Sequence, residues 1–135
     1  VNFFDFIERN FVSKKVVYGW SDINSEAYNN LNLQTEFLIK NGLPKEKFKV
    51  FDFDKDTLPS KKFDVVISLY SLDYHYDFNL YLEYLKKNTH NESKIIFDTV
   101  RPDFFKSVFK EVIVLNEITK RVHSSKRLLC RNFLS

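Results

Sequence analysis

The spacing of hydrophobic and polar residues changes along the chain, and each change marks the boundary of a predicted element. Near the amino end, apolar residues recur at helical spacing, which predicts a short amphipathic helix. These residues are Phe3, Phe4, Ile7 and Phe11. Residues 16–18 then predict a strand, and the stripe of apolar residues between Ser25 and Asn41 predicts a helix that ends at the Asn-Gly pair. The first third of the chain therefore predicts a strand followed by a helix.

Two strand patterns follow in the middle of the chain. Residues 48–53 predict a short strand, and an Asp-rich loop separates it from the next one. Residues 65–70 are apolar apart from Ser68, which is typical of a parallel strand covered on both faces. We therefore expect residues 65–70 to lie at the centre of a sheet.

The last part of the chain alternates again between helical and strand patterns. After Asp77, apolar residues at Phe78, Tyr81, Leu82 and Leu85 follow the spacing of an amphipathic helix. Strands are predicted at residues 94–98, 112–115 and 127–133, with a short helix at residues 104–109. The last two strands leave little room for a crossover helix, so they predict an antiparallel hairpin at the sheet edge. This alternation predicts an α/β fold with three layers.

Composition limits the class of protein. The chain has 135 residues, of which 44% are hydrophobic and 17% aromatic, with Gly 2 and Pro 3, so disordered and collagen-like classes are excluded. This length suits one domain, residues 1–135. A single cysteine, Cys130, cannot form an internal disulfide or a multi-cysteine zinc site, which favours the cytoplasm. No stretch approaches the roughly 20 apolar residues of a membrane span.

Charge adds one further feature. The formal net charge is +3, and residues 120–135 carry several basic residues and no acidic one. Lysine and arginine on an exposed edge hairpin discourage aggregation, which is the simpler interpretation. The alternative is a surface that binds anions or nucleic acid. We do not expect nucleic acid to be the main partner.

The order of these elements resembles the class I S-adenosylmethionine-dependent methyltransferases from about Val16 to the end. The residues that carry the resemblance are the loop Asp54-Lys55-Asp56-Thr57-Leu58-Pro59 and the strand Phe63-Asp64-Val65-Val66-Ile67-Ser68. The segment Ser71-Leu72-Asp73-Tyr74-His75-Tyr76 is similar to one in sugar O-methyltransferases of bacterial polysaccharide biosynthesis. The resemblance implies a Rossmann-like three-layer sandwich, mostly parallel, with an antiparallel carboxyl-terminal hairpin. It also implies S-adenosylmethionine as cofactor and methyl transfer to a hydroxyl of a sugar or related polar metabolite.

The glycine content departs from this family. Its members begin with a strand and an acid-x-Gly-x-Gly loop, whose glycines let the backbone approach the cofactor. Here the only glycines are Gly19 and Gly42, and neither fits such a loop. Together with the absence of methionine, this predicts an amino-terminal truncation that removed the first strand and its loop. The parent protein is then the enzyme and this chain alone is inactive. The alternative is a catalytically inactive, methyltransferase-like binding module.

Five residues are candidates for binding the cofactor, three of them from the resemblance and two from their place at the end of a strand. Asp22 matches the acid that accepts the ribose hydroxyls, and Asp54 with Lys55 matches the loop at the adenine. Tyr70 and Ser71 end a strand where open α/β sheets place ligands. For Asp22 the alternative is an acid that favours a helix amino end, and for Asp54 it is turn chemistry.

His75 is the candidate general base. Methylation of a sugar hydroxyl requires loss of its proton, and a histidine with a pKa near neutral can accept it. The alternative is a loop histidine that bonds a neighbour. His90 lies in a polar loop and is predicted to be exposed.

Three acids leave a metal-binding alternative open. Asp73, Asp77 and Asp98 supply hard oxygen atoms that suit Mg²⁺, but their spacing is not diagnostic. We therefore predict no metal site.

Overall fold

The computed structural model describes residues 4–8, 31–52, 55–69, 71–74, 76–119 and 124–134. Contacts divide the chain into two compact units, Val1–Pro59 and Ser60–Ser135, hereafter the amino-terminal and carboxyl-terminal units. Within the described ranges, no helix is both long and apolar enough to cross a membrane.

The amino-terminal unit contains a parallel pair of strands and a helix. Strand β1 (Phe4–Glu8) pairs with β2 (Phe48–Asp52) so that Phe4 lies opposite Phe48. Helix α1 (Leu31–Lys40) precedes the 3-10 turn η1 (Lys45–Lys47) and β2. Gly42 has a φ of +84°, a left-handed conformation that suits glycine at the end of a helix, so the predicted stop signal is confirmed.

The helix predicted from Phe3 to Phe11 is wrong over residues 4–8, because these residues form β1. The phenylalanine residues that give this segment its helical spacing also favour β-strands. Pairing with β2 supplies this segment with backbone hydrogen bonds between strands and decides the outcome. The strand predicted at residues 16–18 lies outside the described residues.

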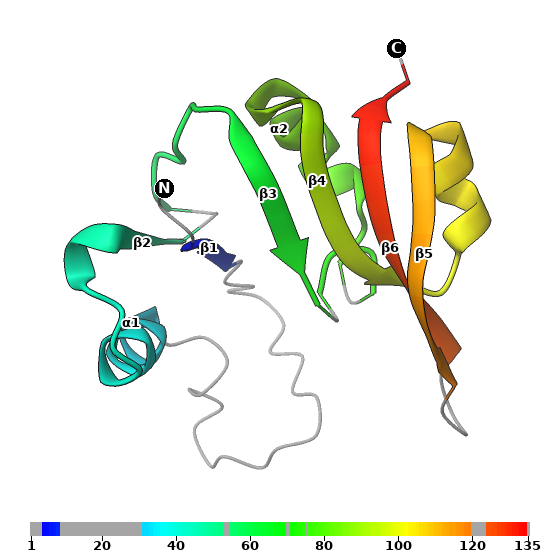
Figure 1. Ribbon diagram of the computed structural model, residues 1–135. Helices are drawn as coiled ribbons and strands as arrows, with labels where there is room; N and C mark the ends of the chain where they lie inside the picture. The colour runs from blue at the N-terminus through cyan, green and yellow to red at the C-terminus, as the bar shows by residue number, and fades with distance from the viewer. Residues whose placement is uncertain are drawn as a thin grey trace. The chain divides into compact units, whose positions relative to one another are not determined.

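The carboxyl-terminal unit contains a four-stranded mixed sheet (Figure 1). Its strands are β3 (Phe63–Ser68), β4 (Thr89–Thr99), β5 (Phe109–Thr119) and β6 (Ser124–Phe133), in the order β3-β4-β6-β5. The β3–β4 pair is parallel, whereas β4–β6 and β5–β6 are antiparallel. The predicted α/β class and carboxyl-terminal hairpin are thus confirmed, while this sheet is mixed and not mostly parallel.

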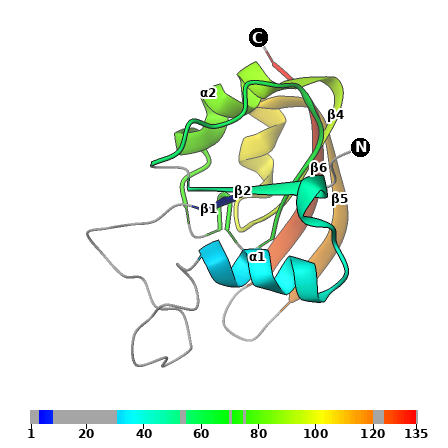
Figure 2. The same cartoon turned by 90° about the vertical axis from the view of Figure 1, so that its left-hand side faces the viewer.

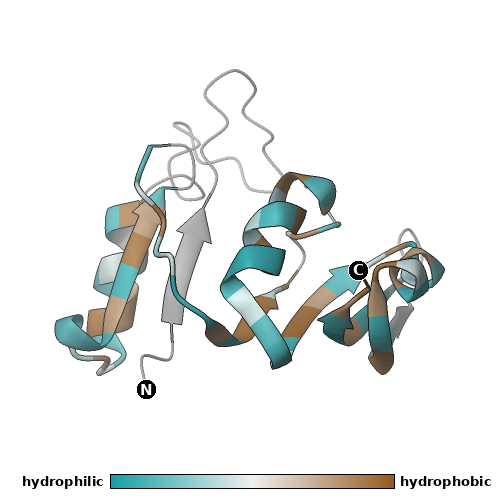
Figure 3. Ribbon diagram, turned by 90° about the horizontal axis from the view of Figure 1, so that it is seen from above, coloured by the Kyte–Doolittle hydropathy of each residue, from teal (hydrophilic) through white to brown (hydrophobic). Residues whose placement is uncertain are grey.

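Two helical segments cover one face of this sheet. Helix α2 (Asn79–Asn88) and the 3-10 helix η2 (Pro102–Ser107) lie on the same side of the strands (Figures 1 and 2). Asp77 accepts a hydrogen bond from the Asn79 amide at 3.0 Å, and the predicted apolar stripe of α2 packs inward through Leu85. Figure 3 shows how hydrophobic and hydrophilic segments alternate along the chain.

A cluster of phenylalanine rings fills the core between the sheet and these helices. The centroids of Phe97 and Phe105 lie 4.7 Å apart and those of Phe78 and Phe105 5.0 Å apart, both pairs in edge-to-face geometry. Such pairs add to the free energy gained by burying the rings. Cys130 is buried beside them, and burial raises the pKa of its thiol to about 12. Cys130 is therefore a core residue and a poor nucleophile.

The opposite face of the sheet carries a row of aliphatic residues that crosses all four strands. Strand register places Ile67 beside Ile96, Ile96 beside Leu129, and Leu129 beside Ile113. Ile67 is 58% exposed and Ile113 42% exposed. The prediction that residues 65–70 lie at the sheet centre, buried on both faces, is therefore wrong for the described sheet, where β3 is an edge strand.

The matched leucines of α2 test which face of the helix is buried. Leu85 is 5% exposed and Leu80 49% exposed, so the two substitutions to alanine share their helix propensity and differ in the cavity they leave. We expect Leu85→Ala to lower the free energy of unfolding by about 3 kcal/mol and Leu80→Ala by less than about 1 kcal/mol, measured by urea denaturation. Equal losses would contradict the packing of α2 described above.

Candidate functional site

The carboxyl ends of β3 and β4 lie at the same edge of the sheet because these two strands are parallel. Open α/β sheets bind ligands at this edge. The segment from Leu69 to Phe78 follows β3 and leads to α2, and Thr99 to Arg101 end β4 and lead to η2. Residues from these two connections meet there.

The connection after β3 is a tight turn closed by its own hydrogen bonds. The Leu72 amide donates to the Ser68 hydroxyl at 3.0 Å. The Ser71 carbonyl accepts hydrogen bonds from the amides of Tyr74 at 3.2 Å and Tyr76 at 3.1 Å. The Asp73 amide donates to the Tyr76 carbonyl at 2.7 Å. These hydrogen bonds join residues of the turn to one another and join Leu72 to the end of β3.

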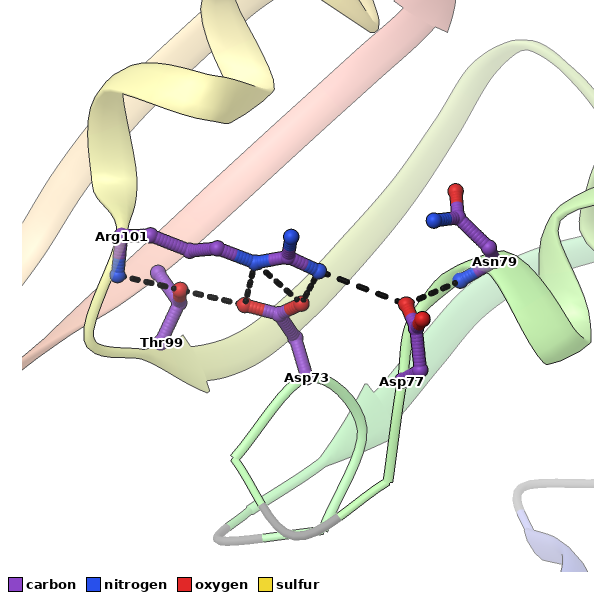
Figure 4. Close-up of polar contacts among 5 residues, drawn as sticks. All are labelled: Asp73, Asp77, Asn79, Thr99 and Arg101. Carbon is purple, nitrogen blue, oxygen red and sulfur yellow. Dashed lines mark hydrogen bonds and ion pairs between the residues drawn. The ribbon is translucent and has the colours of Figure 1, made fainter.

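Asp73 is the central residue of this turn. Its φ is +61°, a left-handed conformation that few non-glycine residues adopt, and its carboxylate has 0% exposure. The Thr99 hydroxyl donates to Oδ2 at 2.5 Å, and Arg101 donates to Oδ1 through Nε at 3.0 Å and through Nη2 (Figure 4). The buried charge is therefore compensated by an oriented guanidinium and a hydroxyl.

Arg101 is held on several sides at once. Its amide donates to the Thr99 hydroxyl at 2.9 Å, and its guanidinium lies over the Phe104 ring, 4.3 Å from the centroid. Nη2 also lies 3.4 Å from Oδ1 of Asp77. The hydrogen bond to Asp73 raises the pKa of the guanidinium above its ordinary value, so Arg101 remains charged. We call Asp73, Asp77, Thr99 and Arg101 the site cluster.

The site cluster offers a hydrogen-bonded, partly exposed polar surface. Arg101 is 43% exposed and Asp77 57% exposed, whereas the carboxylate of Asp73 is sequestered. Figure 4 shows the remaining guanidinium nitrogen of Arg101 pointing away from both carboxylates. Donor and acceptor atoms thus lie side by side, and the cluster holds one more carboxylate than guanidinium. Such a surface suits neutral polar groups, such as hydroxyls, better than anions.

A second ion pair joins β4 to β6. Arg127 donates to Asp98 through Nε at 2.9 Å and through Nη2 at 3.2 Å, and the two residues face each other across the strands. Of the acids considered for a metal, Asp73 and Asp98 thus each bind an arginine. Among the described residues, no three His, Cys, Asp or Glu side chains gather as a metal site would require.

The opposite edge of the sheet has a shallow hollow of about 260 Å³. It is lined by Lys86, Thr89, His90, Asn91, Asn132, Phe133 and Leu134. His90 is exposed, as predicted, but it belongs to β4 and not to a loop, and its Nε2 lies 3.1 Å from Asp64. The buried Thr89 hydroxyl is used within the fold, donating to the Leu85 carbonyl. The hollow therefore offers mainly solvated side chains.

The structure places two of the six predicted site residues. Lys55 lies in the turn after β2, with Nζ 3.1 Å from the Asp52 carboxylate. Ser71 lies in the tight turn after β3, in the other unit. Asp22, Asp54, Tyr70 and His75 lie outside the described residues, so their predicted roles remain predictions.

Arg101 and Thr99 were not predicted as site residues. They follow the buried strand at residues 94–98 directly, and Pro102 comes next. Polar residues just after a buried strand, with a proline ending the extended segment, are a signal that could have found them. Their partner, Asp73, is far away in sequence and could not be identified from the pattern.

Comparison of the chain with protein-family models, with curated proteins and with solved structures finds no significant match.

Removal of the Arg101 charge tests the site cluster directly. In Arg101→Met the buried carboxylate of Asp73 loses its cation, so we expect the free energy of unfolding to fall by about 3 kcal/mol. Lys106 forms an exposed ion pair with Asp103 at 2.6 Å, and Lys106→Met should cost less than about 1 kcal/mol. Urea denaturation of both variants measures the difference, and equal effects would contradict the described burial of Asp73.

Proposed function

We propose that the chain is part of a cytoplasmic methyltransferase that uses S-adenosylmethionine and methylates a hydroxyl of a sugar or a related polar metabolite. The observation that carries this proposal is the polar turn at the carboxyl end of the parallel β3–β4 pair, where Asp73 binds Arg101. This edge is where open α/β sheets bind ligands. The family resemblance of the segment from Ser71 to Tyr76 supplies the chemistry.

The exposed face of the carboxyl-terminal sheet supports the proposed Rossmann-like three-layer sandwich. A second layer of helices over Ile67, Ile96, Leu129 and Ile113 would bury this aliphatic row. The edge position of β3 leaves its outer side for the first strand that the family would place there. Both features support a sheet that extends beyond the four strands of this unit.

Lys55 and Ser71, in separate units, each lie in the kind of position where open α/β sheets bind ligands. Each follows a strand that belongs to a parallel pair, at the carboxyl end. The turn that contains Lys55 is closed by the Asp56 carboxylate, which accepts a hydrogen bond from the Asp52 amide at 2.7 Å. In the proposed enzyme, Asp22 accepts the ribose hydroxyls, Asp54 and Lys55 contact the adenine, and Tyr70 and Ser71 line the cleft. S-adenosylmethionine supplies an electrophilic methyl group when bound.

The proposed mechanism needs one base and precise alignment. His75 would accept the proton of the acceptor hydroxyl as that oxygen bonds to the methyl carbon, while the bond between the methyl group and the sulfonium sulfur breaks and S-adenosylhomocysteine is left. The transfer is direct, so no covalent intermediate with the protein forms. The chain contributes mainly by holding the acceptor in line with the methyl group.

One observation favours a second candidate function. Gly19 and Gly42 are the only glycines in the sequence, which therefore lacks the glycine-rich loop that approaches the cofactor in the family. A methyltransferase-like module without that loop could bind a partner and have no catalytic activity. The binding of S-adenosylmethionine separates this alternative from the enzyme.

Calorimetric titration with S-adenosylmethionine tests the proposal. The whole protein encoded by the gene should bind with a Kd on the order of micromolar, whereas residues 1–135 alone should bind more than about 100-fold more weakly. The chain alone lacks the contacts of the glycine loop, and two lost charge-assisted hydrogen bonds are sufficient for this difference. Absence of binding by the whole protein would refute the enzyme, and equal binding by the chain alone would refute the role given to the missing loop.

Substitution of His75 tests the proposed base. In the whole protein, His75→Ala should lower kcat about 10²- to 10⁴-fold and leave the Kd for S-adenosylmethionine unchanged. The measurement is formation of S-adenosylhomocysteine with a panel of saccharide acceptors. His90 lies at the amino end of β4, away from the site cluster, so His90→Ala is the matched control and should keep kcat within about twofold. An unchanged kcat in His75→Ala would exclude this residue as the base.

A further inference from the structure

Arg101 is anchored on one side and open to solvent on the other. Two of its guanidinium nitrogens bond to the carboxylate of Asp73, which has no exposed surface, and the flat group lies over the ring of Phe104. The side chain of Arg101 is nevertheless 43% exposed. An arginine that is already oriented in this way loses little conformational freedom when a ligand binds its open side. Arg101 is therefore suited to bind a ligand while it compensates the charge of Asp73.

Asp77 presents a carboxylate beside this guanidinium. Its Oδ1 accepts a hydrogen bond from the Asn79 amide at 3.0 Å and lies 3.4 Å from Nη2 of Arg101. The side chain of Asp77 is 57% exposed. Among the described residues, none bonds to Oδ2 of Asp77 or to Nη1 of Arg101, the nitrogen that points away from both carboxylates in Figure 4. One acceptor and one donor are thus available on neighbouring side chains.

Two neighbouring hydroxyls match this pair of atoms. A hydroxyl both donates and accepts hydrogen bonds, so one hydroxyl can accept from Nη1 of Arg101 while the next one donates to Oδ2 of Asp77. Hydrogen bonds to ionised groups are the stronger kind, and both contacts belong to it. An anion such as phosphate would face the carboxylates of Asp73 and Asp77 with a single guanidinium to offset them. The charges of the site therefore favour a neutral ligand.

We propose that Arg101 and Asp77 form a subsite that binds two neighbouring hydroxyls of a neutral saccharide, with Asp73 as the anchor that orients Arg101. The subsite lies at the carboxyl ends of β3 and β4, the edge at which open α/β sheets bind ligands. This inference rests on the proposed function only in taking the saccharide as the methyl acceptor. It goes beyond that function by naming the side chains that select the acceptor and the pair of hydroxyls that they bind.

Titration with methyl glycosides tests the subsite without any transfer reaction. The probes are the methyl glycosides of mannose, galactose and glucose, together with analogues that each lack one ring hydroxyl. The readout is the NMR signal of the Arg101 Nε–H group in the isotope-labelled whole protein, identified by its loss in Arg101→Lys. We expect at least one glycoside to shift this signal with a Kd on the order of 1 mM. Removal of either of two neighbouring hydroxyls should weaken its binding about 10-fold.

The substitution Asp77→Asn tests the acceptor half of the subsite. Asparagine keeps one oxygen for the Asn79 amide and replaces Oδ2 with an NH2 group, which cannot accept a hydrogen bond. We expect the Kd for the glycoside to rise about 10-fold. Asp64→Asn is the matched control, because Asp64 is also an exposed acid paired with a basic side chain, His90, but lies near the amino end of β3. Its Kd should stay within about twofold of the unsubstituted protein.

The outcomes separate the subsite from the proposed function. Weaker binding in Asp77→Asn but not in Asp64→Asn, with two neighbouring hydroxyls required, supports the subsite. Absence of glycoside binding, equal binding of all the analogues, or tighter binding of inorganic phosphate at Arg101 overturns it, and these comparisons need no variant. If the glycosides bind as expected and the whole protein binds no S-adenosylmethionine, the subsite stands and the proposed function fails. If methyl transfer occurs and Asp77→Asn leaves the acceptor KM unchanged, the function stands and the subsite fails.

Discussion

A carboxylate without exposed surface lies at the carboxyl end of the parallel strand pair, and the arrangement of the site depends on how its charge is compensated. Water cannot solvate Asp73, so the guanidinium of Arg101 and the hydroxyl of Thr99 take that part. Both donors come from the end of β4, whereas Asp73 belongs to the turn after β3. Compensation of the buried Asp73 carboxylate therefore holds the connection after β3 beside the connection after β4. The same contacts hold Asp73 in a left-handed backbone conformation.

The aromatic core packs against the same segments that carry the buried ion pair. Phe105 in η2 packs against both Phe78, just before α2, and Phe97 in β4. Because η2 starts directly after Arg101, the packing of Phe105 also fixes the place of the arginine. The ring of Phe104 adds a second contact beneath the guanidinium. Apolar packing and the buried ion pair thus act on the same short segment.

Local patterns predicted the carboxyl-terminal elements better than their positions in the sheet. The spacing of Phe78, Leu82 and Leu85 identified α2 because a helix repeats its buried face at short sequence separation. The apolar run at residues 65–70 identified β3 but not its edge position, since burial on two faces depends on neighbours outside the run. Residues 4–8 form a strand that pairs with β2, although the spacing of their apolar residues favoured a helix. Asp73 was considered only as a metal ligand, because nothing local to it indicates a partner 28 residues away.

The most direct test of the account is the coupling energy between Asp73 and Arg101. A double-mutant cycle with Asp73→Asn, Arg101→Met and the combined variant measures it through the free energies of unfolding. If the buried carboxylate and the guanidinium compensate each other as described, the coupling energy should be about 2 kcal/mol or more. A coupling energy below about 0.5 kcal/mol would mean that the two residues act independently, and it would contradict the account.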